Sequence, residues 1–108
     1  MDQIRKQGLY SEICDFVDRN GVYVGASGSS IIMGPTVEVE QWIRASNDVG
    51  LEDTSGFGYV DFITVPHVDS RRERGQKVVD FHASTGHKMM YITDKQVILV
   101  IDDMYKII

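Results

Sequence analysis

A serine set among small residues is the first candidate for chemistry in this sequence. Residues 25–29 read Gly-Ala-Ser-Gly-Ser, which departs from the G-x-S-x-G pattern of a nucleophile elbow only in its last residue. Such a serine needs small neighbours because the cramped turn between strand and helix lifts its hydroxyl clear of the sheet. The N–H of Gly28 can then point at a developing oxyanion. Small-residue turns with serine are also common where no chemistry occurs, so the motif indicates Ser27 as a nucleophile only if a base accompanies it.

A histidine at the end of a predicted strand can supply that base. His67 follows the β-type run from Tyr59 to Val65 and one proline. Active sites of open α/β sheets gather at the carboxyl ends of strands. His82 lies in a predicted helix and His87 in a glycine turn, where a surface or capping role suits a histidine better. We therefore predict His67 as the general base, with a structural role as the open alternative.

The elements that must position these residues follow from hydrophobic periodicity. Residues 4–17 predict an amphipathic helix that stops at Asn20-Gly21, and the run from Gly21 to Gly25 predicts a strand buried on both faces. A helix of one or two turns is expected over 30–33. The remaining predictions are a loop over 49–57, a strand over 59–65, a helix over 71–83, and apolar runs at 89–92, 97–101 and 105–108 typical of antiparallel strands. The sequence therefore predicts an α/β fold.

Composition limits the partners and the compartment. The 108 residues, 43% of them hydrophobic, fit one core, so we expect 1–108 to form a single partial domain. Sixteen acidic against eleven basic residues give a net charge of −5, which argues against nucleic acid as a partner. The lone Cys14 favours a reducing, cytoplasmic location. No apolar run approaches the roughly 20 residues that cross a bilayer, and no Cys and His grouping has metal-ligand spacing. We expect no membrane, metal or cofactor.

Four short motifs follow one another in an order that is more specific than any of them alone. They read Tyr-Val-Gly-Ala-Ser-Gly-Ser-Ser at 23–30, Gly-Pro-Thr at 34–36, Phe-Gly-Tyr-Val at 57–60 and Pro-His-Val-Asp at 66–69. Together they resemble the carboxy-terminal half of the peptidase S51 family, which includes aspartyl dipeptidases of the peptidase E type and cyanophycinases. In that family an aromatic-x-G-x-S-A-G segment carries the nucleophile, and a P-H-x-D-type segment carries the histidine. The resemblance runs from about Gly8 to about Asp102.

The resemblance implies both a fold and a reaction. The fold is a glutamine-amidotransferase-like, or flavodoxin-like, three-layer α/β sandwich, here incomplete, with antiparallel strands at the carboxyl terminus. The reaction is hydrolysis of short peptides with an amino-terminal aspartate by a triad of Ser27, His67 and a carboxylate near a late turn, with Gly28 as an oxyanion donor. Asp94 matches the position of that carboxylate best. Asp69, two residues after the histidine, is the alternative, and the substrate-binding residues stay unassigned.

Two departures from the family pattern define an alternative function. The family's Ala-Gly after the nucleophile is Gly28-Ser29 here. Family chains are also usually much longer, and their front half carries the first strands of the parallel sheet and a Gly-Gly-Asn-type loop with another oxyanion donor. Loss of one such donor typically costs about 10²- to 10³-fold in rate. The alternative is a truncated, noncatalytic member, or a half-domain that forms a homo-oligomer or complements a separate amino-terminal half.

Overall fold

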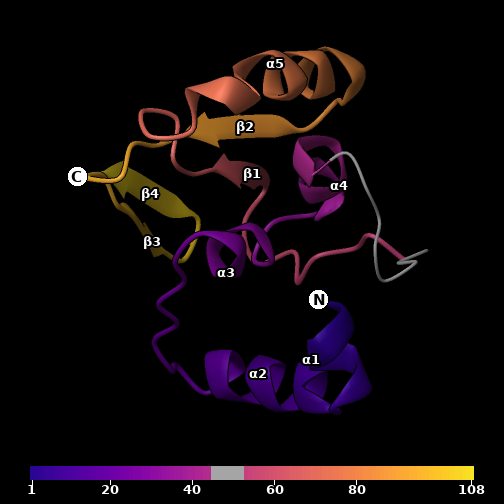
Figure 1. Ribbon diagram of the computed structural model, residues 1–108. Coiled ribbons are helices and arrows are strands. Elements are labelled where there is room, and N and C mark those ends of the chain that lie inside the picture. The colour runs from indigo at the N-terminus through magenta and orange to yellow at the C-terminus, as the bar shows by residue number, and fades with distance from the viewer. Residues whose placement is uncertain (45–52) are drawn as a thin grey trace.

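The protein is a mixed helix and strand fold, seen in a computed structural model that describes residues 1–44 and 53–108 (Figure 1). None of the described helices is long and apolar enough to cross a membrane. In chain order the elements are α1 (Asp2–Lys6), α2 (Leu9–Asp18), α3 (Gly28–Ile31), α4 (Glu38–Arg44), β1 (Phe62–Val65), the 3₁₀ turn η1 (Arg72–Arg74), α5 (Gly75–Ser84), β2 (Lys88–Tyr91), β3 (Ile98–Ile101) and β4 (Met104–Ile107).

The strands form two small sheets of opposite kind. β1 and β2 pair in parallel, with Val65 opposite Tyr91, and all four residues of β1 are buried, as in a strand covered on both faces. β3 and β4 form an antiparallel hairpin, with Ile98 opposite Ile107. The antiparallel prediction is therefore confirmed for the last two apolar runs and wrong for the first. The first run is parallel to β1 because α5 provides the long crossover that a parallel connection needs.

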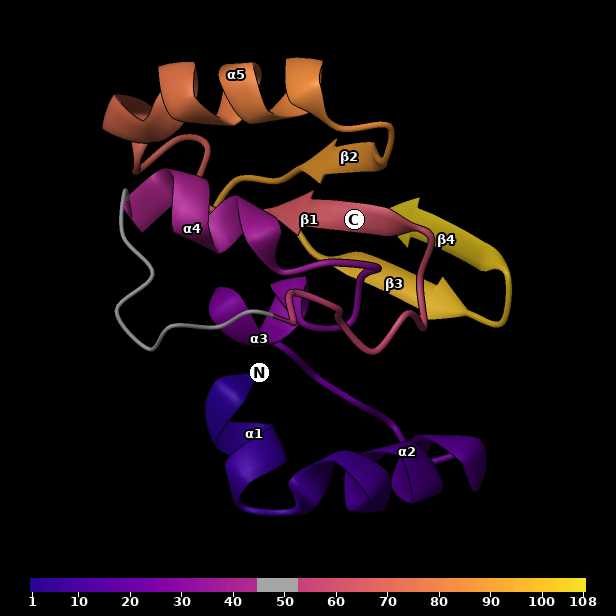
Figure 2. The same cartoon turned by 90° about the vertical axis from the view of Figure 1, so that its right-hand side faces the viewer.

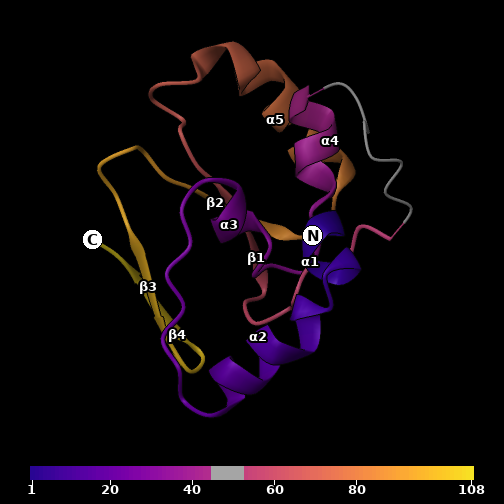
Figure 3. The ribbon, with the colours of Figure 1, turned by 60° about the horizontal axis from the view of Figure 1, so that its bottom comes forward.

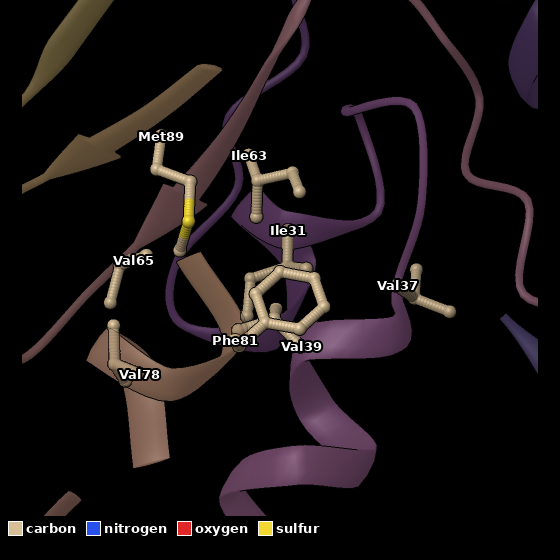
Figure 4. Close-up of a cluster of buried hydrophobic side chains, with 8 residues drawn as sticks. All are labelled: Ile31, Val37, Val39, Ile63, Val65, Val78, Phe81 and Met89. Atoms are coloured by element: carbon tan, nitrogen blue, oxygen red, sulfur yellow. The ribbon is translucent and has the colours of Figure 1, made fainter. Parts of the chain in front are cut away.

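The hydrophobic core lies between α5, the parallel sheet and the two short helices α3 and α4. Figure 4 shows Phe81 of α5 directed at Val39 and Ile31, and all three side chains are at most 2% exposed. The Trp42 and Phe81 rings form a T-shaped pair with their centroids 5.6 Å apart. The whole cluster is Ile31, Val37, Val39, Ile63, Val65, Val78, Phe81 and Met89. Through Ile31, the helix that follows the candidate nucleophile is anchored directly in this core.

The amino-terminal region differs from its sequence prediction in two ways. The single helix expected over 4–17 is two helices, because Gly8 has a φ of 70° and turns the chain between them. Residues 21–25, expected as a buried strand, run extended between α2 and α3 (Figure 2) but belong to no sheet in the described part of the chain. Val22 and Val24 are 79% and 88% exposed. A strand needs a hydrogen-bonded neighbour, and the described residues place none there.

The other elements follow the sequence prediction with shifted ends. The short helix expected over 30–33 is α3, the strand expected over 59–65 is the shorter β1, and the helix expected over 71–83 is η1 followed by α5. Of the loop expected over 49–57, residues 49–52 lie outside the described residues. Residues 53–57 are irregular apart from one bridge between Ser55 and Thr36.

The β3–β4 hairpin stands away from α4 and α5 (Figure 3). It meets the parallel sheet through Tyr105, whose ring tilts against Phe62 at a centroid distance of 5.2 Å and lies 5.5 Å from the Lys88 ammonium. Ile101 and Met104, at the tip of the hairpin, are 63% and 76% exposed. The described chain thus has a packed side around α5 and an open apolar side.

Two neighbouring valines on α5 test where the core ends. Val78 is 6% exposed and Val79 is 58% exposed. Val78→Ala should lower the free energy of unfolding by about 2 kcal/mol, because it removes two buried methyl groups and leaves a cavity. Val79→Ala is the matched control and should change it by less than about 0.5 kcal/mol. Urea denaturation measures both, and equal effects would contradict the packing of α5 against the sheet.

Candidate functional site

Ser27 occupies a tight turn between the extended segment and α3. A Cβ at Gly25 would lie 2.5 Å from the Ser29 carbonyl oxygen, so the close approach of the two segments requires glycine. The Tyr23 hydroxyl donates a hydrogen bond of 2.7 Å to that same carbonyl. Ser27 itself is exposed. The glycine and the aromatic residue of the motif therefore hold a turn that exposes Ser27 to solvent. Sequence analysis did not indicate this supporting contact of Tyr23.

A line of hydrogen bonds connects Ser27 to a carboxylate. Nε2 of His67 lies 3.0 Å from Oγ of Ser27, and Nδ1 lies 2.6 Å from Oδ1 of Asp94. An ionised carboxylate only accepts hydrogen bonds, so Nδ1 carries the proton, and Nε2 of the neutral ring accepts from the serine hydroxyl. In this tautomer a histidine can take the proton of an attacking serine. The structure thus brings together the three residues that the sequence singled out.

The parallel pairing of β1 and β2 is what brings His67 and Asp94 together. Hydrogen bonding between the two chains continues past the strand ends: the Ile92 N–H donates to the Val65 carbonyl at 3.0 Å, and the Val68 N–H donates to the Ile92 carbonyl at 3.2 Å. The carboxyl ends of parallel strands lie at the same edge of a sheet. The loops that follow β1 and β2 therefore meet, and each carries one of the two residues.

Asp69, the alternative acid, is placed differently. Its Oδ1 accepts a hydrogen bond of 3.0 Å from the backbone N–H of Asp94. The imidazole of His67 is hydrogen-bonded to Asp94, so this geometry favours Asp94 as its partner. Sequence reasoning missed Ser70, whose side chain lies near the Asp94 carboxylate and lowers its pKa. The only available signal was its position three residues after the histidine.

The Asp94 carboxylate is held in its ionised form. The hydrogen bond from Ser70, followed by that from His67, lowers the pKa of Asp94 below its ordinary value of 3.8, and the nearby positive charge of Arg71 acts in the same direction. The side chains of His67 and Asp94 are 33% and 43% exposed, so the site is open to solvent in this chain. Asp94 is therefore available as an acceptor for the imidazole throughout the neutral pH range.

The N–H of Gly28, the expected oxyanion donor, begins α3 without a backbone acceptor in the described part of the chain. The next two amides are already used, since Ser29 donates to the Ala26 carbonyl and Ser30 to the Ser27 carbonyl, both at 3.0 Å. Gly28 is the first residue of α3 and so has no acceptor within the helix. The departure from the family's Ala-Gly is sterically mild here. A Cβ at Gly28 would meet nothing closer than a Glu40 carboxylate oxygen at 3.7 Å, and Ser29 is exposed.

The remaining candidates for chemistry lie apart from these contacts. His82 is hydrogen-bonded to the Tyr91 hydroxyl at 2.5 Å, and His87 is exposed in the turn before β2. Cys14 is half-buried in α2. Among residues 1–44 and 53–108, no group of three or more His, Cys, Asp or Glu side chains is placed to hold a metal ion.

Comparisons with known proteins agree on one family. The family model described as Peptidase family S51 matches residues 1–108. Peptidase E of Salmonella gallinarum and Peptidase E of Escherichia coli strain K12 / DH10B are each 30% identical over 80 residues, which cover 71% of this chain and 32% of the relative. The crystal structure of a candidate Peptidase E protein from Listeria monocytogenes EGD-e superposes with a TM-score of 0.78 at 18% identity, over 96% of this chain and 50% of that chain.

The structural likeness confirms the predicted fold class. The chain has the α/β, flavodoxin-like architecture with an incomplete sheet and antiparallel strands at its carboxyl end. Its match spans about a third of the length of the curated relatives and half of the Listeria chain. The family model covers every residue of the sequence. The chain belongs to peptidase family S51.

Proposed function

We propose that this chain carries the catalytic triad of a serine peptidase of the aspartyl dipeptidase type. Ser27 is the nucleophile, His67 the general base and Asp94 the acid that orients it. The observation that supports the proposal is the line of hydrogen bonds from Ser27 to His67 to Asp94, at 3.0 and 2.6 Å. The family resemblance points to short peptides with an amino-terminal aspartate as substrates, and the single Cys14 favours a cytoplasmic location.

The geometry suits acylation followed by hydrolysis. Nε2 of His67 takes the hydroxyl proton as Oγ of Ser27 attacks the peptide carbonyl carbon, and the N–H of Gly28 faces the oxyanion that forms. The imidazolium, stabilised by Asp94, gives the proton to the departing amine. Water then attacks the acyl carbon while His67 takes one of its protons. The imidazolium gives that proton to Oγ of Ser27 as the bond between Oγ and the acyl carbon breaks, which releases the carboxylic product and restores Ser27. The scheme uses no cofactor.

The backbone at the site provides a second, independent argument. The described non-glycine residues with φ in the left-handed region are Asn20, Ser27, His67 and Asp102, so the proposed nucleophile and base are two of the four. Such conformations cost of order 1–3 kcal/mol and persist at functional sites, where they aim a side chain. The coincidence of this strain with the hydrogen-bonded pair supports a catalytic rather than a structural role for both residues.

Covalent labelling tests the assignment of the nucleophile. An organofluorophosphonate probe should modify Ser27 alone, because among the described residues it is the one serine hydrogen-bonded to an imidazole. His67→Ala should abolish labelling while leaving the circular dichroism and the melting curve nearly unchanged. Asp94→Asn should slow labelling by about 10⁴-fold, since the wrong tautomer results. Peptide mapping by mass spectrometry locates the adduct, Ser29→Ala is the matched control, and an adduct on Ser29 or Ser30 would refute the assignment.

The strained backbone of Ser27 gives a prediction about stability. Glycine normally makes a protein less stable than alanine does, by about 0.5–1 kcal/mol. At a φ of 54° the order should reverse, so Ser27→Gly should have the larger free energy of unfolding, by about 1 kcal/mol over Ser27→Ala. Both variants lack the hydroxyl and should resist the probe. Urea unfolding compares them, and a less stable glycine variant would mean that the turn is relaxed.

We propose as a second function that the chain acts as a half-domain, residues 1–108, that pairs with further strands of the family sheet. The supporting observation is the extended segment 21–25, which has the residues of a buried strand, lacks a neighbour in the described chain, and leaves Val22 and Val24 79% and 88% exposed. Exposed apolar strands invite pairing with another chain. A homo-oligomer or a complementing chain would provide the missing contacts.

Native mass spectrometry at micromolar concentration tests this pairing. The chain should appear above its monomer mass of 12.2 kDa. The double change Val22→Lys and Val24→Lys should reduce the assembled fraction, because it places charge on the open strand. Val79→Lys, at another exposed valine on α5, is the control and should leave assembly unchanged. A monomer at 12.2 kDa would rule out self-pairing.

A further inference from the structure

The loop after β1 is tied to Asp94 by two hydrogen bonds that run in opposite directions. Nδ1 of His67 donates to the Asp94 carboxylate at 2.6 Å, whereas the Asp94 backbone N–H donates to the Asp69 carboxylate at 3.0 Å. One bond holds the side chain of Asp94 and the other holds its main chain. Asp94 cannot move away from the imidazole without breaking at least one of them.

We propose that Asp69 is a positioning residue for the triad: it fixes the main chain of Asp94 so that the carboxylate meets Nδ1 of His67. The inference deepens the proposed function and rests on it. In this role Asp69 acts as a hydrogen-bond acceptor and not as a charge. The two aspartates that were candidates for the acid then have different roles. The Asp94 carboxylate accepts from the imidazole of His67, and the Asp69 carboxylate accepts from the backbone N–H of Asp94.

The turn that carries Asp94 needs such an outside contact. Within the turn, the Thr93 N–H donates to the Gln96 side-chain oxygen at 2.9 Å, the Gln96 N–H donates to the Thr93 carbonyl at 3.2 Å, and the Lys95 N–H donates to the Thr93 hydroxyl at 3.3 Å. These bonds fix the shape of the turn but leave its angle to the neighbouring loop open. The Val68 N–H, which donates to the Ile92 carbonyl, joins the two loops just before the turn, and the Asp94 N–H adds a second main-chain tie, to Asp69, at the triad residue itself.

Groups other than Asp69 keep the Asp94 carboxyl ionised. The Ser70 hydrogen bond, the His67 ring and the Arg71 guanidinium keep the pKa of Asp94 below its ordinary value. A second carboxylate next to Asp94 would by itself oppose the ionisation of Asp94, because like charges disfavour each other. Asp69 is also exposed, where water screens its charge. What Asp69 contributes is therefore a hydrogen-bond acceptor for the Asp94 N–H, and not its negative charge.

Two substitutions of Asp69 in the full chain separate geometry from charge. Asp69→Ala removes the acceptor and should slow labelling of Ser27 by the organofluorophosphonate about 10- to 100-fold, the loss expected when a catalytic group is displaced by about 1 Å. Asp69→Asn keeps an amide oxygen that can accept the Asp94 N–H and should stay close to the unchanged chain. Asp103→Ala, which removes an exposed carboxylate from the β3–β4 turn, is the charge-matched control and should have no effect. Equal losses of labelling rate in Asp69→Ala and Asp69→Asn, or no loss in Asp69→Ala, would overturn the proposal.

A second measurement does not depend on the chemistry of Ser27. In Asp69→Ala, the backbone amide of Asp94 should exchange faster with solvent by nuclear magnetic resonance, because it loses its acceptor. The titration midpoint of the Asp94 carboxyl should rise towards 3.8, since a looser turn weakens the hydrogen bond from His67 that helps to lower it. Asp69→Asn should change neither. If the unchanged chain resists the probe, the proposed triad chemistry is refuted. Separately, if Asp69→Ala leaves the exchange of the Asp94 amide and the titration of the Asp94 carboxyl unaltered, the positioning role is refuted.

Discussion

The parallel pairing of β1 with β2 is the constraint on which the site depends. It places the carboxyl ends of both strands at one edge of the sheet, and the hydrogen bonds between Val65, Val68 and Ile92 extend the pairing into the loops. Ile63 and Val65 of β1 and Met89 of β2 are buried in the hydrophobic core, and the register places Val65 opposite Tyr91 at the end of the pairing. The apolar core thereby sets the 2.6 Å distance between His67 and Asp94, although none of its side chains takes part in the chemistry.

Ser27 reaches the same place by a separate route. Its turn is held on one side by the contact of Gly25 and Tyr23 with the Ser29 carbonyl, and on the other by Ile31, which is 2% exposed in the core. Two rigidly supported pieces of the fold therefore meet at the 3.0 Å contact between Ser27 and the imidazole. Catalytic groups work best when each is fixed by its own supports, because small displacements are costly in rate. The backbone strain at Ser27 is tolerated since both sides of the turn are anchored.

The sequence predicted features that depend on neighbouring residues and did not predict those that depend on contacts between distant segments. Residue type and strand-end position made Ser27 and His67 candidates and set His82 aside, and the family resemblance gave the two candidates their proposed roles. The preference for Asp94 over Asp69 came only from the family resemblance, since the contact itself depends on the angle between two loops that are 25 residues apart. The direction of the strand at 88–91 depends on the α5 crossover, and a run of four apolar residues does not encode it. Segment 21–25 was predicted as a strand from its composition alone, but a strand also requires a neighbour.

The exposed apolar segment 21–25 lies close in the chain to the proposed triad, and the two can influence each other. Electrostatic stabilisation of an oxyanion is strongest where water is excluded, and the His67 and Asp94 side chains are 33% and 43% exposed here. The unpaired segment 21–25 ends two residues before Ser27, so a strand laid against Val24 would also approach the nucleophile's turn. Pairing at this edge would bury apolar surface and lower the local dielectric around the triad in a single step. If the proposed triad is catalytic, completion of the sheet would therefore give its hydrogen-bonded geometry the dry surroundings in which an oxyanion is best stabilised.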